Sequence, residues 1–346
     1  MSRMVPAALA ALMAGCLFHG PAVADAVTDF YTGKQVRLVI GYPAGAGYDV
    51  HARLLGRHMG HHIPGAPAII PQNMPGAGSI RAANYVYNVA VKDGLTIGAI
   101  NRSVPLAPLL GTTEKEQTQF DPLQFGWIGS MNTTVSIAIV WAASGITKFE
   151  ELLQREVVVA ASAPASDSYV FAHILNNIVG TKLKIVAGYQ GSTENYLALE
   201  RGEAVGYMGT SYSSLKSTKP DWIRDKSVNI LVQVSLAKDP DLPDVPLIMD
   251  YAKTDAQKQA LELILAPQQT GRPYMTTPGV DAARLQALRT AFVATMKDPA
   301  FVSEAGKQTI DIDPMDGEAV QTLLAKLFRT PPDVVKSAQE ALRVAP

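Results

Sequence analysis

The feature that most constrains the fold of this chain is an alternation of apolar strands, Gly/Pro-rich loops and helices along most of its length. In the first unit, Val36 to Gly41 (VRLVIG) is a β-branched apolar run, a loop follows from Tyr42 to Gly47, and a helix is expected from Asp49 to about His62. A continuous apolar run of this length is typical of a strand buried on both faces. Because strands that alternate with helices form parallel sheets covered by helices, the pattern predicts an α/β protein.

The same alternation continues in two blocks that are separated by a proline-rich segment. Asp239 to Pro246 carries three prolines in eight residues, and we interpret it as a return linker. The pattern therefore predicts two lobes, with lobe 1 at residues 25–128 plus 242–346, lobe 2 at 129–241, and hinges near 129–132 and 237–242. Further strands are expected at 68–71, 95–100, 136–141, 157–161, 184–187, 204–208, 229–234 and 272–276, and further helices at 80–88, 168–179, 193–201, 254–265, 281–297, 299–307, 317–328 and 332–342.

The first 24 residues have the pattern of a secretory signal peptide. Arg3 supplies a positive charge, Val5 to Leu17 is an apolar stretch too short to span a bilayer, and Ala22-Val23-Ala24 offers small residues for cleavage after Ala24. We therefore expect a soluble mature chain in the periplasm. Cys16, the only cysteine, would be removed, which excludes disulfides and thiolate sites. A lipid anchor on Cys16 is the less favoured alternative, because Met13 fits that motif poorly.

Composition excludes several classes of protein. The 30 basic and 31 acidic residues give a net charge of -1, which argues against nucleic acid or a polybasic membrane surface as a partner. With 47% hydrophobic and 18% charged residues, the chain can build a packed core and is not expected to be disordered.

Four loops rich in Gly, Pro or Ser each connect a predicted strand to a predicted helix. Glycines let a backbone approach a ligand closely, and free N–H groups at a helix start favour an anion. A plain turn, or helix capping by the serines, is the alternative for each loop. Loops at the carboxyl ends of strands converge on a cleft, which here suits a carboxylate. The candidate binding residues are Pro43, Ala44, Gly45, Ala46, Gly47, Tyr48 and Asp49; Asn73, Met74, Pro75 and Gly76; Ser162, Ser166, Asp167 and Ser168; and Tyr189, Gln190 and Gly191.

The chain offers little that points to catalysis or a cofactor. It has no phosphate-binding loop, dinucleotide fingerprint or nucleophile elbow. Asp49 could be a general base, but a helix N-cap is favoured. His51, His58 and His62 share a helix face and could bind a metal, although packing against neighbouring structure is favoured. We therefore expect no catalytic residue, metal or cofactor.

Two acidic residues lie close to the expected cleft. Asp167 and Glu194 could each bind an amine on the ligand. Each could equally be a solvent-exposed acid at the start of a helix, where it interacts favourably with the helix dipole. The solvent-exposed interpretation is favoured.

Several segments together resemble the periplasmic receptors of tripartite tricarboxylate transporters, the Bug or TctC-like family. They are VRLVIGYPAGAGYDVHARLL, QNMPGAGSIRAANYV, VKDGLTIGAIN, VAGYQGSTENYLALERGEAVGYM, DLPDVPLIMDYA, GRPYMTTPGV and MKDPAFVSEA, and they extend from about Tyr31 to Val320. The resemblance implies a two-lobed type II periplasmic-binding-protein fold, each lobe a mostly parallel sheet flanked by helices, with the ligand cleft between the lobes. It also implies a carboxylate ligand held at the four loops, membrane permease subunits as partners and no enzymatic activity. We expect a monomer.

Three positions depart from the family pattern. Tyr48 stands where a small hydroxyl residue is common, Met74 where arginine is common, and Gln190 where lysine is common. Since cations strengthen hydrogen bonds to carboxylates, these changes predict a less charged ligand that is partly apolar or aromatic. An exported hydrolase on a two-lobed fold and a ligand-sensing subunit are the alternative functions.

Overall fold

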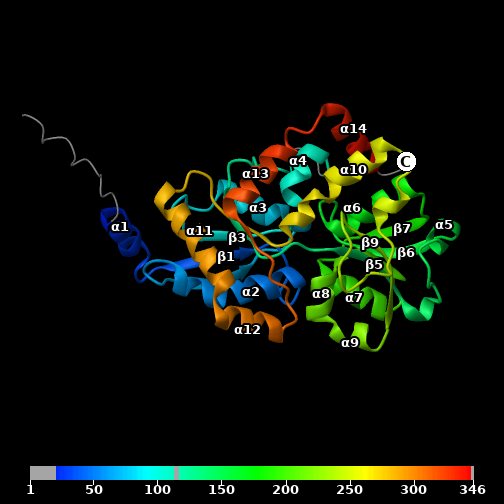
Figure 1. Cartoon of the computed structure of the whole chain (residues 1–346), viewed down its shortest axis with the longest axis horizontal. Helices are drawn as coiled ribbons and strands as arrows, with labels where there is room; N and C mark the ends of the chain where they lie inside the picture. The colour runs from blue at the N-terminus through cyan, green and yellow to red at the C-terminus, as the bar shows by residue number, and fades with distance from the viewer. Residues whose placement is uncertain (1–20, 113–116, 344–346) are drawn as a thin grey trace, which may run out of the picture.

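Residues 21–112 and 117–343 of this computed structural model form two β-sheets, each with helices on both faces (Figure 1). The predicted signal segment up to residue 20, with Cys16, lies outside the described residues. The first described element, helix α1 (Pro21–Tyr31), runs through the expected cleavage position at residue 24. Across the described ranges, no helix combines the length and apolar content that a membrane crossing requires.

The first sheet has the strand order β11-β4-β10-β3-β1-β2. β1 pairs in parallel with β2 and β3, whereas β10 lies antiparallel between β3 and β4. Ile40, the last residue of β1, is in register with Asn73 of β2 and Ala99 of β3, so the loops that follow these strands begin at one edge. The strands are β1 (Gln35–Ile40), β2 (Ala68–Asn73), β3 (Thr96–Ala99), β4 (Gly126–Ser130), β10 (Pro273–Thr276) and β11 (Met315–Asp316).

The second sheet has the order β7-β6-β8-β5-β9. β7, β6 and β8 are parallel, and β5 is antiparallel to β8 and β9. Most strands of each sheet thus run in one direction, as predicted, and β5, β10 and β11 run against the strands they pair with. The strands are β5 (Ser136–Trp141), β6 (Val157–Ala161), β7 (Leu183–Ala187), β8 (Gly206–Ser211) and β9 (Val228–Val234).

Alternating side chains of the strands supply separate apolar clusters above and below each sheet. Leu38 and Ile40 of β1 enter one cluster with α2 and α11, while Val39 between them enters another with α3 and α13. This is why an unbroken apolar run is needed: both faces of the strand are covered. The helices of the first sheet are α2 (Gly47–Met59), α3 (Ile80–Asn88), α4 (Ala107–Leu110), α11 (Ala282–Lys297), α12 (Pro299–Lys307) and α13 (Gly317–Leu327).

The second sheet is covered in the same way. Ile137 and Ile139 of β5 face α7, α8 and α9, whereas Ala138 and Val140 join the large cluster that also holds α6 and α10. That large cluster continues across to α3 and α13 of the first sheet, so the two lobes share apolar packing along the side where α4, α10 and α14 lie (Figure 1). The helices are α5 (Glu151–Gln154), α6 (Asp167–Ile174, continued by a π-helical turn at Leu175–Val179), α7 (Ser192–Glu200), α8 (Tyr212–Thr218), α9 (Pro220–Arg224), α10 (Asp255–Leu265) and α14 (Pro332–Ala341).

The predicted return linker remains attached to the second sheet. The backbone N–H of Gln233 in β9 donates to Pro246 O at 2.8 Å, and its side-chain Nε2 donates to Leu242 O and Val245 O, each at 2.9 Å. Farther on, Gln257 of α10 donates to Ile178 O. These hydrogen bonds hold residues on both sides of position 242 against the second sheet and its helices.

The two segments that connect the sheets lie side by side. Gly271 N donates to Asn132 O at 2.8 Å, and Thr134 N donates to Gln268 O at 3.0 Å. We propose that the lobes meet at these two segments, 131–134 and 268–271, and that the second hinge lies here rather than at the expected 237–242.

Candidate functional site

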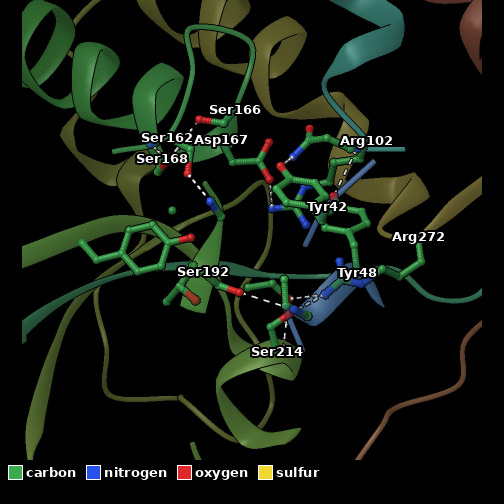
Figure 2. A pocket seen from close by; sticks show the side chains of 18 residues that line it. Tyr42, Tyr48, Arg102, Ser162, Ser166, Asp167, Ser168, Ser192, Ser214 and Arg272 are labelled. Atoms are coloured by element: carbon green, nitrogen blue, oxygen red, sulfur yellow. Dashed lines mark hydrogen bonds and ion pairs between the residues drawn. The ribbon is translucent and has the colours of Figure 1, made fainter. Parts of the chain in front are cut away.

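The ends of strands from both sheets enclose a cavity of about 40 Å³ (Figure 2). The first lobe contributes the loop after β1, the loop after β3 and the residue before β10. The second lobe contributes the loops after β6 and β7 and the end of β8. The wall consists of Tyr42, Ala46, Gly47, Tyr48, Asn101, Arg102 and Arg272 on one side and Ser162, Ser166, Asp167, Ser168, Gly191, Ser192, Tyr207, Gly209, Thr210, Ser211 and Ser214 on the other.

The structure divides the candidate binding residues into three groups. Ala46, Gly47, Tyr48, Ser162, Ser166, Asp167, Ser168 and Gly191 lie in the wall of this cavity. Pro43, Pro75, Gly76, Tyr189 and Gln190 instead line an adjoining groove of about 430 Å³, which shares Tyr42, Ser162 and Gly191 with the cavity. Ala44, Gly45, Asp49, Asn73 and Met74 line neither space.

Asp49 is buried and links the first two loops through hydrogen bonds. Its carboxylate accepts hydrogen bonds from Arg53 Nε at 2.9 Å, Asn73 Nδ2 at 2.7 Å and Gly45 N at 2.8 Å. Ala46 is the N-cap of α2, so Asp49 is the third helical residue and not the N-cap expected from sequence. Because protein donors already engage both carboxylate oxygens, Asp49 is not placed to act as a general base.

Arg102 is a cavity residue that was not among the predicted candidates. Its side chain is only 1% exposed, and Nη2 donates to Ser136 Oγ at 2.5 Å and to Asp167 Oδ2 at 2.7 Å. Its Nε and Nη1 have no hydrogen-bond partner among the described residues. Asp167 is also buried and accepts from Ser103 Oγ at 2.5 Å, so it is not the solvated helix-start acid that was the favoured interpretation. Figure 2 shows Asp167 directed at Arg102 and Tyr42.

Arg272 is a second buried arginine on the same cavity. Its Nη2 donates to Ser214 Oγ at 2.6 Å and Ser211 Oγ at 3.2 Å, while its Nε lacks a partner among the described residues. The guanidinium lies 4.5 Å from the ring centre of Tyr48, which also stacks on Tyr42 at 4.8 Å with an interplanar angle of 8°. The partners of Tyr48 are therefore side chains of the protein itself.

Met74 and Gln190 do not leave the cavity without cations. Met74 packs against the main apolar cluster and is outside the cavity, and Gln190 lies in the adjoining groove. Arg102 and Arg272, which enter from the ends of β3 and β10, supply two positive charges instead. Arg272 lies in the segment GRPYMTTPGV that carries the family resemblance, whereas Arg102 directly follows the segment VKDGLTIGAIN; each stands beside the end of a predicted strand.

The cavity carries a net positive charge. Burial raises the pKa of Tyr42, Tyr48 and Tyr207 above the usual range of a phenol, so these side chains are neutral. Burial lowers the pKa of Arg272, but an arginine starts so high that the guanidinium stays charged. Two guanidiniums and one carboxylate, all buried, leave a formal charge of about +1 in the wall. Unpartnered N–H groups and an excess positive charge together are suited to binding an anion.

The three histidines proposed for a metal each have a separate partner. His51 is buried and its Nδ1 donates to Gly47 O at 2.7 Å, while His58 contacts Glu304 at 2.7 Å and His62 contacts Asp298 at 2.9 Å. Over the described ranges, no group of three or more His, Cys, Asp or Glu side chains is arranged to hold a metal ion. The three histidines are thus occupied by contacts within the protein.

Glu194, the second acid considered near the cleft, accepts a hydrogen bond from the backbone N–H of Gln190 within its own loop.

Glycines allow the lobes to close onto one another at the cavity. Gly47 N donates to Ser192 Oγ of the other lobe at 3.3 Å, and a Cβ at Gly47 would overlap Ser214 Oγ. At Gly191, a Cβ would lie 2.9 Å from the ring of Tyr42. Side chains at these positions would hold the lobes apart.

Comparisons with known proteins agree with this architecture. Residues 52–336 match the model of the family described as tripartite tricarboxylate transporter family receptor. The chain is 25% identical over 309 residues to a UPF0065 protein of Cupriavidus necator, covering 84% of this chain and 83% of the relative. It is 26% identical over 302 residues to a UPF0065 protein of Bordetella bronchiseptica, covering 83% and 78%.

Two solved structures show the same fold. The periplasmic binding protein BugD superposes with a TM-score of 0.69 at 18% identity, covering 90% of this chain and 98% of that protein. MatC from Rhodopseudomonas palustris with bound malate also gives 0.69 at 18% identity, covering 89% and 99%. The predicted two-lobed periplasmic-binding-protein fold is thereby confirmed.

Proposed function

Because the chain belongs to the tripartite tricarboxylate transporter family of receptors, we propose that it captures a small carboxylate between its lobes and delivers it unchanged to membrane permease subunits. In this proposal the mature protein works in the periplasm. Carboxylates bound by proteins of the same fold support it: MatC holds malate, and a second Rhodopseudomonas palustris protein, with a TM-score of 0.68 at 17% identity, holds adipate.

The single observation that carries the proposal is the pair of buried guanidiniums. Arg102 and Arg272 each present N–H groups that have no acceptor among the described residues. An unpartnered buried donor costs about 1–3 kcal/mol, and more when it is charged. A carboxylate in the cavity would accept charge-assisted hydrogen bonds from these groups and remove that cost. The site is therefore more stable with an anion than without one.

Both arginines also connect the lobes. Arg102 comes from the first sheet and contacts Asp167 of the second, and Arg272 contacts Ser214 of the second. A ligand held by these side chains would gain most of its contacts only in the closed form. Binding would then shift the open–closed equilibrium toward closure by the difference in its affinity for the two states.

The wall does not assemble hydrolytic machinery. A serine nucleophile needs an adjacent general base. Asp167 is the only acid in the wall, and it is engaged by Arg102 and Ser103. The wall contains no histidine, lysine or cysteine. These facts support a binding protein over the alternative of an exported hydrolase.

The test is a thermal-shift screen of the chain from Asp25 onward with mono-, di- and tricarboxylates. A bound ligand raises the melting temperature by mass action. We expect a shift with one class of carboxylate and no conversion of that compound by mass spectrometry. The shift should disappear in Arg102→Gln combined with Asp167→Asn, which removes both charges together, and persist in Arg329→Gln at an exposed position. Turnover of the compound, or no shift with any carboxylate, would overturn the proposal.

A further inference from the structure

The charges of the cavity specify which carboxylates it can accept. Arg102, Arg272 and Asp167 are the charged members of the wall, and the tyrosines that share it are neutral. If Asp167 were absent, two guanidiniums would require a ligand with two negative charges. With Asp167 bound to Arg102, one positive charge is already neutralised.

Asp167 is held in this role by its surroundings. It is the first residue of α6 and lies in the second lobe, yet both of its oxygens contact the first lobe, through Arg102 Nη2 at 2.7 Å and Ser103 Oγ at 2.5 Å. The side chain is buried, so it cannot turn into solvent without separating the lobes. Asp167 therefore accepts a hydrogen bond from Arg102 Nη2, an N–H group that a second carboxylate of the ligand would need.

The size of the cavity sets a second limit. Its volume of about 40 Å³ corresponds to about three positions for water, and to about 90 Å³ of liquid volume. That is room for a carboxylate of about two or three carbons. Tyr42 and Tyr48 stack on each other in the wall, so a larger or aromatic ligand would have to displace them.

The remaining wall is rich in hydroxyl groups. Ser192 Oγ accepts from Gly47 N, and Tyr48 OH accepts from Arg102 N, which leaves the proton of each hydroxyl without an acceptor among the described residues. A hydroxyl on the ligand could accept from either. Ala46 adds a small apolar surface that would accommodate a methyl group.

We propose that Asp167 acts as an internal counter-anion that restricts this receptor to short, singly charged carboxylates, of which 2-hydroxy acids such as glycolate and lactate fit the wall best. This inference rests on the proposed function and narrows its ligand class. The second carboxylate of a dianion would lie beside the negative charge of Asp167, or it would lie where no cation faces it. Removing a charge from water without a partner costs several kcal/mol, so charge excludes a dianion of any length, and size excludes in addition the longer dianions.

The test compares ligands that differ in charge but not in carbon number. Titration calorimetry would measure glycolate against oxalate, each with two carbons, on the wild-type chain. We expect glycolate to bind at least tenfold more tightly. In Asp167→Asn the ratio should move at least tenfold toward oxalate, because the cavity then has two uncompensated guanidiniums. Asp333→Asn, at an exposed acid, should leave the ratio unchanged.

A second series tests size. Lactate should bind more tightly than benzoate or hexanoate, which exceed the closed cavity. If oxalate or malate binds the wild-type chain more tightly than glycolate, or if Asp167→Asn leaves the ratio unchanged, the inference is wrong while the receptor function stands. If no carboxylate binds at all, the proposed function fails first. Should Asp167→Asn not fold, the wild-type glycolate-to-oxalate ratio alone decides.

Discussion

At the scale of single residues, Asp49 illustrates how a side chain outside the cavity can determine its shape. The residue is 2% exposed, and its carboxylate joins Gly45 of the first loop to Asn73 at the end of β2. We predict that Asp49→Ala lowers the free energy of unfolding by about 2 kcal/mol, since it leaves buried donors without an acceptor. Urea unfolding of this variant beside Asp333→Ala would measure the loss. A loss no greater than that of the exposed control would show that the network is dispensable.

His51 gives a prediction for pH dependence. Burial, followed by the positive charge of Arg272, lowers the pKa of His51 well below 6.5, so the ring is neutral in the folded chain. The unfolded chain, with an ordinary histidine, takes up a proton as the pH falls below about 6.5, and the folded chain does not. Stability is therefore unaffected above that pH and falls by up to about 1.4 kcal/mol per pH unit below it, until the folded pKa is reached.

The variant His51→Gln should reduce this slope. Urea unfolding at pH 5, 6, 7 and 8 would show a smaller decrease in the variant than in the wild-type chain. Some slope will remain, because burial also lowers the pKa of His173. Equal slopes in the two chains would mean that His51 is protonated in the folded state.

Residue-level prediction from sequence succeeded where the backbone itself forms the wall. Gly47 and Gly191 lie where the lobes meet, and a Cβ at either position would be too close to the other lobe. A glycine in a strand-to-helix loop is visible in the sequence, so these two positions could be predicted. Prediction failed for Arg102 and Arg272, because a long side chain can reach a cavity from segments outside the four Gly-, Pro- or Ser-rich strand-to-helix loops. The directions of Met74 and Gln190 also depend on local backbone angles that loop composition does not specify.

At the scale of elements, continuous apolar runs located most strands. The bounds of β5 and β6 agree with prediction, and α12 does too. β4 (GWIGS) was missed because two glycines weaken its apolar signal, and α8 was missed because serine, threonine and lysine dominate it. Strand direction is not readable from an apolar run, so the antiparallel positions of β5 and β10 required the structure. That direction is what brings Arg272, just before β10, to the cavity.

The start of α2 offers an element-scale test of closure. Gly47 is the first residue of the helix, and a methyl group there would overlap Ser214 of the opposite lobe. We predict that Gly47→Ala weakens carboxylate binding at least tenfold without lowering the melting temperature of the unliganded chain, because alanine favours a helix. Gly306→Ala is the matched control: it lies in α12, and a Cβ there meets no atom within 4 Å. Unchanged affinity in Gly47→Ala would mean that the lobes do not close at this contact.

At the scale of the whole molecule, closure depends on polar contacts around the cavity and one ion pair beside the hinge. Lys216 of α8, in the second lobe, lies 2.8 Å from Asp311, which precedes β11 of the first lobe, and 3.2 Å from Asp241 of its own lobe. Lys216 is 14% exposed, whereas Asp311 is 55% exposed. Such a partly solvated pair is worth about 0–1 kcal/mol, which is enough to bias an equilibrium between two states of similar energy.

We predict that Lys216→Met shifts the unliganded protein toward the open form and weakens ligand binding by about two- to fivefold, the range that follows from a loss of up to about 1 kcal/mol. Small-angle X-ray scattering without ligand should give a larger radius of gyration for the variant, and calorimetry should give the change in affinity. Lys336→Met is the control, since this lysine is exposed and forms an ion pair with Glu340 within α14. Because salt screens exposed charges, the difference from the wild-type chain should shrink at high ionic strength. A difference that is the same at low and high salt would assign the effect to lost packing of the lysine stem and would contradict an electrostatic contribution to closure.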